Sequence, residues 1–252
     1  MIDQTTLAYV NLYAVLGALA DLTSLDPRAQ ALLKGKKPTR LGIAVKGGPA
    51  ATLVFEEQRC RLEEGVGQCH IKLAFSSPQR FNGMIAGTVT PIPRKGWTRI
   101  FFLTRTFTRL TDRLTQLLRA KPEDLEDPDF LALSTHLMLG VVGEAVAQIA
   151  NHDPIGMFSA SNIVDGQIAL AIHDGPAVTV ECRDHRLTCR KEPAETPRAV
   201  MEFESCRLAH QLFDGQVNAV ACIGSAQIRM RGMISMLDNL NRILDRVGLY
   251  LA

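Results

Sequence analysis

Two segments of the chain, "GPAATLVFEEQR" (residues 48–59) and "GPAVTVECRDHR" (residues 175–186), repeat one pattern at an offset of 127 residues. Followed towards the amino terminus at the same offset, Asp26 falls on Asp153, and each is followed by proline. The agreement continues over about 110 positions, and its gaps lie where turns are expected. The pattern therefore predicts a duplicated domain rather than a solenoid of short repeats.

The duplication predicts where the domains lie. We expect a first domain at residues 1–120, a second at residues 129–252 and a linker at residues 121–128, where prolines and acids suit an exposed connector. Residues 1–126 carry a net charge of +7 and residues 127–252 one of −5, although the whole chain is only +2. We also expect domain–domain contact within the chain.

The composition is that of a soluble globular protein, with 46% hydrophobic and 21% charged residues. Residues 7–20 are apolar, but they are interrupted by Asn11 and have no basic leader, so we expect neither a signal peptide nor a membrane span. Six cysteines in a large chain without a secretory leader are typical of free thiols. We therefore expect a cytoplasmic protein.

Each copy shows the same order of predicted elements. An opening helix precedes a meander of three short strands, a fourth strand, a capped helix, one more strand and a last helix. The opening helices are expected at residues 7–22 and 131–150, the meanders at 41–64 and 167–191, and the fifth strands at 98–103 and 226–230. This order predicts an α+β fold of two tandem domains, each an antiparallel-rich, mixed five-stranded sheet covered by helices.

The later part of the alignment rests on serines and glycines. Ser77 and Ser205 are expected to cap the helices that follow the fourth strands, which end at Phe75 and Phe203. Further on, the alignment pairs Gly87 with Gly215, Gly96 with Gly224 and Leu110 with Leu240.

The second copy resembles the sterol carrier protein type-two family in the stretch "MEFESCRLAHQLFDGQVNAVACIGSAQIRMRGMISMLDNL" (residues 201–240). Glu204, Gly215 and Gly232 stand where that family has an acidic residue, a helix stop and a glycine before the last helix. The first copy is the poorer match, because Ser76 replaces the acid and Thr104 stands near the position of the last glycine.

The resemblance implies a non-catalytic domain that carries a sterol, fatty acid, acyl ester or isoprenoid lipid in an apolar tunnel. Burial of such a chain at ~0.8 kcal/mol per methylene makes this binding plausible. The implied lining residues are Phe203, Leu212, Phe213, Ile228, Met230, Met233, Met236, Leu237, Leu240 and Leu244 in the second copy, and Phe75, Met84, Phe101 and Phe107 in the first. The stripe of Met and Leu in the last helix also suits an ordinary core.

Arg105, Arg109 and Arg113 recur every fourth residue and so share one helix face. Three readings stay open: a solvated face, contact with lipid headgroups during transient membrane-surface contact, or contact with the acidic second copy. Nucleic acid is not expected as a partner, because aromatic residues are few and the net charge is near neutral.

No motif indicates catalysis, a metal or a cofactor, since the cysteines align with core hydrophobic residues and the histidines lack ligand spacing. We therefore expect no enzyme. The alternative to a carrier is an interaction or accessory module whose cavities are filled by side chains, for example in a lipid-modifying complex.

Overall fold

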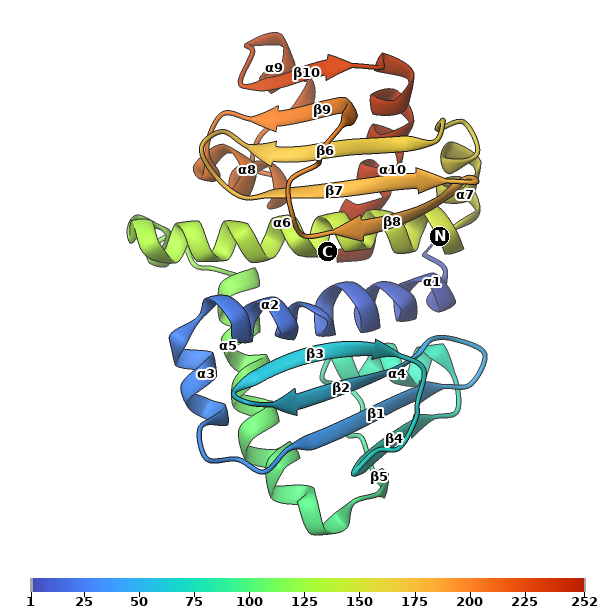
Figure 1. Cartoon of the computed structure of the whole chain (residues 1–252), viewed down its shortest axis with the longest axis vertical. Coiled ribbons are helices and arrows are strands. Elements are labelled where there is room, and N and C mark those ends of the chain that lie inside the picture. The colour runs from blue at the N-terminus through green and yellow to red at the C-terminus, as the bar shows by residue number, and fades with distance from the viewer. Residues whose placement is uncertain (1, 252) are drawn as a thin grey trace. The chain divides into compact units, whose positions relative to one another are not determined.

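Both alternating stretches form antiparallel ladders in the structure, a computed structural model that describes residues 2–251 (Figure 1). The chain divides into unit 1 (Met1–Lys121) and unit 2 (Pro122–Ala252). Each unit has its own sheet and its own helices.

Unit 1 opens with a nearly continuous helix, and a second long helical stretch closes it. Its helical elements are α1 (Gln4–Tyr9), η1 (Val10–Leu16), α2 (Ala18–Leu25), α3 (Pro27–Leu33), α4 (Pro78–Ile85), η2 (Trp97–Arg99), η3 (Phe102–Phe107) and α5 (Thr108–Leu118). Its strands are β1 (Thr39–Val45), β2 (Ala50–Glu56), β3 (Arg59–Glu64), β4 (Ile71–Phe75) and β5 (Pro93–Lys95).

Unit 2 repeats this order and adds one short helix before its last strand. Its helical elements are η4 (Asp124–Glu126), α6 (Pro128–His152), α7 (Pro154–Ala160), α8 (Cys206–Phe213), α9 (Ala219–Gly224) and α10 (Ile234–Leu251). Its strands are β6 (Gly166–Ile172), β7 (Ala177–Arg183), β8 (Arg186–Arg190), β9 (Pro197–Phe203) and β10 (Ile228–Gly232).

The two sheets have the same strand order, β3-β2-β1-β4-β5 in unit 1 and β8-β7-β6-β9-β10 in unit 2. In each sheet one pair is parallel, β1 with β4 and β6 with β9, and the other pairs are antiparallel. The register also agrees, because Thr39 faces Phe55 and Gly166 faces Cys182 at the aligned positions. The predicted α+β class with mixed five-stranded sheets is confirmed.

The prediction of a fifth strand at residues 98–103 of unit 1 is wrong. The strand is β5, and the chain after it is helical from Trp97 onwards. Gly96 ends the strand with a φ of 98°, and a Cβ there would clash with the backbone oxygen of His70. Gly232 does the same in unit 2, with a φ of 90° and a clash against Arg198. Gly96 therefore corresponds to Gly232, not to Gly224, and α9 is an insertion of unit 2.

A buried carboxylate joins the start of α3 to α5 in unit 1. Asp26 caps α3, where its Oδ1 accepts a hydrogen bond from the Arg28 backbone N–H at 2.9 Å. Its Oδ2 accepts one from Arg113 Nε at 2.7 Å. Only 4% of the Asp26 side chain and 13% of the Arg113 side chain are exposed. We call this pairing the Asp–Arg clamp.

Unit 2 has the same clamp at the aligned aspartate. Asp153 Oδ1 caps α7 by accepting from the backbone N–H groups of Ile155 and Gly156, each at 3.0 Å. Its Oδ2 accepts from Arg246 at 2.8 Å and from the Tyr250 hydroxyl at 2.7 Å. The clamp aligns Arg113 with Arg246. This alignment of the last helices differs by about one turn from the predicted one, which paired Leu110 with Leu240.

Two helical stretches are long and apolar enough to cross a membrane by length and composition, Gln4–Leu25 and Pro128–His152. Most of each stretch is buried inside the protein, 61% and 67% of the apolar window respectively. Both are therefore the principal core helices of their units. Gly143 brings α6 close to the sheet, since a Cβ there would lie 2.8 Å from Cys189 and 2.9 Å from Val178.

The clamp of unit 2 predicts a large difference between two arginines of α10. Arg246→Met leaves the buried Asp153 carboxylate without its charged partner and should lower the free energy of unfolding by about 3 kcal/mol. Arg242→Met removes an ion pair with Asp238 whose side chains are 57% and 61% exposed, and serves as the matched control. It should change the free energy of unfolding by less than about 0.5 kcal/mol. Urea denaturation at pH 7 measures both, and equal effects would contradict the role given to the clamp.

The clamp also predicts a pH dependence. Burial alone would raise the pKa of Asp153, but hydrogen bonds from Arg246, Tyr250 and Gly156 outweigh it and hold this pKa below its ordinary value. Its carboxylate therefore stabilises the fold above about pH 4, and this contribution is lost as the pH falls through the lower pKa of the folded state. Between pH 5 and pH 2 the unmodified chain should lose more stability than Asp153→Asn, as judged by urea midpoints. A parallel decline in both would rule this out.

Candidate functional site

The carboxyl-terminal part of unit 2 gathers most of the predicted lining residues around β9 and β10. Phe203 stands directly opposite Ile228, and Met201 stands opposite Met230, so all four side chains share one face of this ladder. The ring of Phe213, from the end of α8, meets Phe203 edge-on at a centroid distance of 5.8 Å. This contact identifies the shared face as the one that α8 covers.

Burial divides the predicted lining residues of unit 2 into two groups. The fully buried group consists of Phe203, Ile228, Met236, Leu237 and Leu240. The half-buried group consists of Leu212, Phe213, Met230, Met233 and Leu244. The main packing partners of α8 are α6 and β9, whereas those of α10 are α6, α7, β9 and β10. In Figure 1 both helices lie behind the strands of this sheet.

The predicted lining residues of unit 1 lie in different environments. Phe75 is buried against Phe81, with ring centroids 5.3 Å apart, and Met84 is half-buried. Phe107 is half-buried, and its ring lies 6.2 Å from that of Phe55. Phe101, by contrast, lies on the surface with 68% of its area exposed.

Aromatic rings fill positions in unit 1 where unit 2 has small side chains. Phe55 of β2 contacts Phe102 at 5.1 Å, and the aligned residue in β7 is Cys182. Phe81 is fully buried four residues after the Ser77 cap, and the residue four after the Ser205 cap is Ala209, also fully buried. At these two positions unit 2 has no ring, but Phe213 meets Phe203 much as Phe81 meets Phe75, so only the ring of Phe55 has no counterpart.

A polar group that sequence reasoning missed lies beneath α8. Ser134 Oγ of α6 is 3.1 Å from His210 Nε2, and Asp214 Oδ2 is 3.1 Å from His210 Nδ1. Serine, histidine and aspartate are the residue types of hydrolase triads. The repeat could have revealed this group, because His210 aligns with Asn82 and both are polar residues on an otherwise apolar helix face.

The geometry of this group favours a structural role. Ser134 is completely buried, and His210 Nδ1 makes no well-directed hydrogen bond despite its short distance to Asp214. A catalytic histidine needs an aligned carboxylate and an accessible nucleophile. In unit 1 the aligned Asn82 bonds to Asn11 at 3.1 Å and to Gln4 without any nucleophile. Both units thus use a buried polar contact to fix the helix after the fourth strand against the opening helix.

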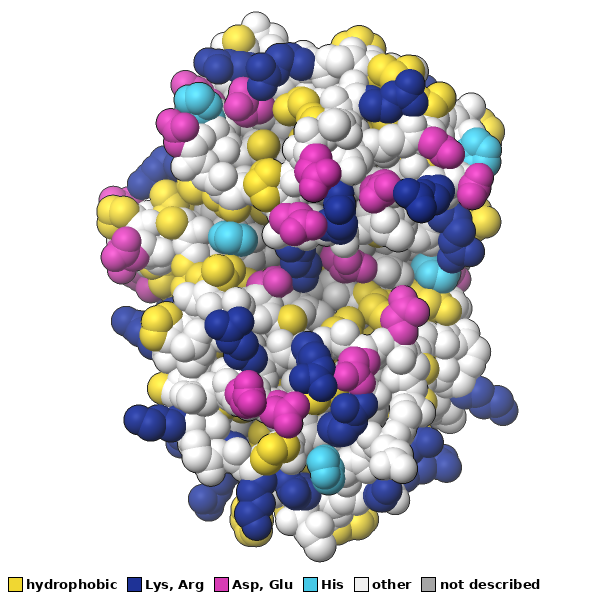
Figure 2. Space-filling model, in the orientation of Figure 1, with side chains coloured by type: hydrophobic (Ala, Val, Ile, Leu, Met, Phe, Trp, Pro, Cys, Tyr) yellow, Lys and Arg dark blue, Asp and Glu magenta, His cyan; other side chains and the backbone are white. Residues whose placement is uncertain are grey.

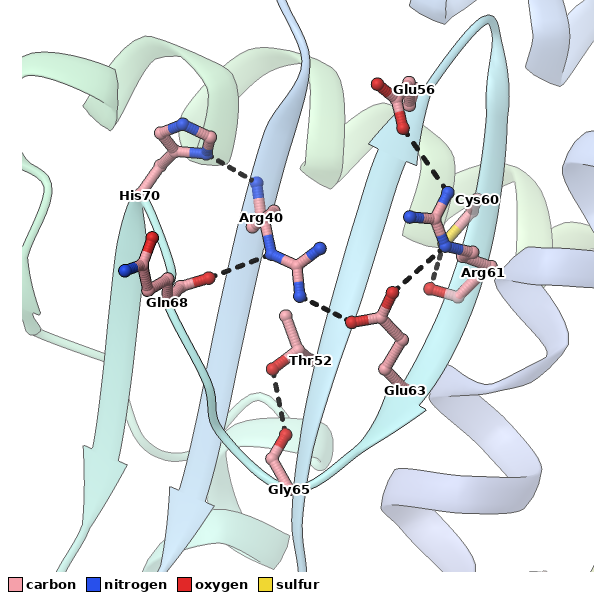
Figure 3. A network of polar contacts seen from close by, with 9 residues as sticks. All are labelled: Arg40, Thr52, Glu56, Cys60, Arg61, Glu63, Gly65, Gln68 and His70. Carbon is pink, nitrogen blue, oxygen red and sulfur yellow. Dashed lines mark hydrogen bonds and ion pairs between the residues drawn. The ribbon is translucent and has the colours of Figure 1, made fainter.

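Two arginines of unit 1, Arg40 of β1 and Arg61 of β3, are paired with acids. Figure 3 shows Arg40 bonded to Glu63 and to the Gln68 carbonyl, while Arg61 bonds to Glu63 at 3.1 Å and Glu56 at 3.4 Å. Hydrogen bonds from Arg40 and then Arg61 lower the pKa of Glu63.

The three arginines predicted to contact headgroups, Arg105, Arg109 and Arg113, differ in whether an acidic side chain pairs with them. Arg113 belongs to the Asp–Arg clamp and points into the unit rather than to solvent. Arg105 and Arg109 are exposed, and within the described residues neither has an acidic partner. The guanidinium of Arg105 instead lies 5.5 Å from the centre of the Phe101 ring.

All six cysteines are free, and none of the described residues forms a group of three or more His, Cys, Asp and Glu side chains that could hold a metal ion. Burial is the main cause of the raised pKa values of the Cys60, Cys182 and Cys206 thiols. These thiols stay protonated at neutral pH and are poor nucleophiles.

No known protein family and no curated protein matches the chain. Among solved structures, the ubiquinone synthesis protein UbiJ-SCP2 is 13% identical over 44% of this chain and 96% of its own, with a TM-score of 0.36. Sterol carrier protein domain 2 of Helicoverpa armigera is 13% identical over 51% of this chain and 93% of its own, with a TM-score of 0.35. A stereoselective inverting sec-alkylsulfatase from Pseudomonas sp. is 12% identical over 57% of this chain and 28% of its own, with a TM-score of 0.25. Likenesses at this level assign no activity to the chain.

A structural role for Ser134 predicts a loss of stability on its removal. Ser134→Ala takes a hydroxyl partner from the buried His210 ring and should lower the free energy of unfolding by about 1–3 kcal/mol. Ser134→Thr keeps the hydroxyl and should recover part of that loss. Hydrolysis of p-nitrophenyl butyrate should equal the buffer rate in all three proteins. Ester hydrolysis above the buffer rate that disappears in Ser134→Ala would refute the structural assignment.

Proposed function

We propose that the chain is a non-catalytic cytoplasmic carrier in which unit 2 holds one hydrophobic ligand, of the sterol, fatty acid, acyl ester or isoprenoid class. The ligand would lie between the β9–β10 face and the helices α8 and α10. The support for this proposal is the resemblance of residues 201–240 to the sterol carrier family, together with the side chains of the interior.

The replacement of two aromatic rings by small side chains is the observation that carries the proposal. Cys182 and Ala209 stand where unit 1 has Phe55 and Phe81, and Phe213 replaces only the second of these rings by packing against Phe203. An empty apolar space costs about 24 cal/mol per Å³, so such a loss is best compensated by a guest. Met230, Met233 and Met236 supply flexible side chains that adapt to varied ligand shapes.

For unit 1 we propose the alternative function, an accessory module without a ligand. The contacts of Phe55 with Phe102 and Phe107 support this division, because these rings fill the space that Cys182 leaves in unit 2. Unit 1 would then assist the carrier, for example by bringing it to another molecule.

The carrier proposal predicts that a lipid accompanies the protein through purification. Native mass spectrometry of freshly purified chain should show one added mass of a lipid per chain, and denaturation in organic solvent should release it. After extraction, the protein should bind a fluorescent fatty acid with roughly micromolar affinity. Protein that carries no added mass and binds no probe would refute the proposal.

Matched substitutions predict which unit binds. Ala209→Phe puts into α8 the ring that unit 1 carries at Phe81, and it should weaken probe binding at least tenfold by occupying the guest space. If that space exists, the melting temperature should change little, because the ring has room. If the interior is already filled, overpacking by about 1–3 kcal/mol should lower the melting temperature by several degrees. The control Phe81→Leu, in unit 1, should leave probe binding unchanged.

A further inference from the structure

Unit 1 exposes large aromatic side chains along one helical stripe. The chain is helical from Trp97 through Leu118, and Phe102, Thr106 and Leu110 form its buried face. Trp97 and Phe101, one turn apart, are 63% and 68% exposed. Arg105 and Arg109 continue the same spacing on the solvent side. The stripe is thus aromatic at its amino end and basic further along.

The aromatic end of this stripe is held in place rather than loosely attached. Arg99 Nη1 donates to the Pro38 carbonyl and to Thr39 Oγ1, each at 3.1 Å, which ties η2 to the start of β1. Gly96 packs directly against the backbone of β4 just before Trp97. Ile92, on the other side of β5, is 72% exposed. Apolar groups are therefore presented to solvent by an ordered part of the unit.

The segment that carries these apolar groups is positively charged. Residues 65–111 contain seven Lys and Arg and no Asp or Glu. Lys72 and Lys95 stand directly opposite each other on β4 and β5, a like-charge pair that an anion would relieve. Partial burial first, and then the charges of Arg99, Arg40 and Lys95, lower the pKa of His70. Figure 2 shows Lys and Arg side chains gathered over the end of unit 1 that carries β5 in Figure 1.

Unit 2 neutralises the corresponding strands. Glu202 of β9 lies 3.5 Å from Arg231 and 3.9 Å from Arg229 of β10. The residue of β4 aligned with Glu202 is Ala74. The uncompensated charge is therefore a property of unit 1 and not of the shared architecture.

We propose that Ile92, Trp97 and Phe101, with Arg94, Lys95 and Arg105, form a docking surface for an anionic lipid bilayer. Tryptophan and other aromatic side chains favour the boundary between headgroups and acyl chains. Arginine and lysine beside them attract the negative headgroups. Arg105 over the Phe101 ring pairs both kinds of group in one contact. An acidic soluble protein would satisfy the charges but would not require three exposed apolar side chains among them.

The single tryptophan of the chain, Trp97, reports directly on this surface. Its fluorescence should shift to the blue on addition of vesicles of phosphatidylcholine with 30% phosphatidylserine, and brominated lipids should quench it. The full chain should sediment with these vesicles and stay in solution with pure phosphatidylcholine. Raising the salt from about 0.1 M to 0.5 M should weaken sedimentation at least tenfold, because the interacting charges are exposed.

Matched variants separate the two contributions. Phe101→Ser should weaken vesicle binding about tenfold while circular dichroism stays unchanged. The control Phe158→Ser removes a 65% exposed phenylalanine of unit 2 and should have no effect. Arg94→Gln with Lys95→Gln should weaken binding by about fivefold per charge. The control pair Arg229→Gln and Arg231→Gln, whose charges Glu202 already offsets, should change binding less than twofold.

Several outcomes would overturn the proposal. Unchanged Trp97 emission with vesicles that do bind the chain would place the contact elsewhere. Equal binding to heparin or polyglutamate, with no blue shift, would indicate a general site for polyanions or acidic proteins. Lack of binding to any vesicle would also refute it. None of these results bears on the ligand of unit 2, because the fatty-acid probe measures that ligand separately.

Discussion

A buried carboxylate that serves two helices at once is the interaction on which each unit depends. In unit 2, Asp153 caps α7 with one oxygen and receives Arg246 and Tyr250 of α10 on the other. Asp26 and Arg113 do the same between α3 and α5. A buried ion pair is costly unless its remaining hydrogen bonds are satisfied, and here backbone N–H groups satisfy them. The clamp thereby ties the last helix of each unit to the short helix that follows the opening helix.

With the sheet and the last helix fixed in this way, the two units diverge in what lies between them. Unit 1 places the ring of Phe55 in contact with those of Phe102 and Phe107. Unit 2 has Cys182 in place of the first ring, and it inserts α9 ahead of β10. The two units therefore share a strand order but differ in the side chains of their interiors. Substitution of a core side chain changes the volume that it fills without rearranging the strands. We infer a division of labour, in which unit 2 carries the ligand and unit 1 brings it to a surface.

The two units also differ in how far their positive charges are paired with acids. Unit 2 pairs the arginines of β10 with Glu202, whereas unit 1 has no acid between Glu64 and Asp112. The arginines of unit 1 that do have partners, such as Arg40 and Arg113, stabilise the fold. Arg105, by contrast, lies over the exposed ring of Phe101. Position in the fold, rather than the number of charges, therefore separates structural from surface-acting arginines.

The sequence by itself determined the order of the elements and the class of the sheets. The alternation of apolar and polar residues and the helix caps at Ser77 and Ser205 are local signals, and the repeat shows the same signals twice. Only the tertiary structure decided the roles of Arg113, His210 and Phe101, because those roles depend on the group that each side chain meets. The helix at residues 98–103 was not predicted for the same reason. Gly96 packs against the backbone at the start of β4, and the residues around it do not reveal this contact.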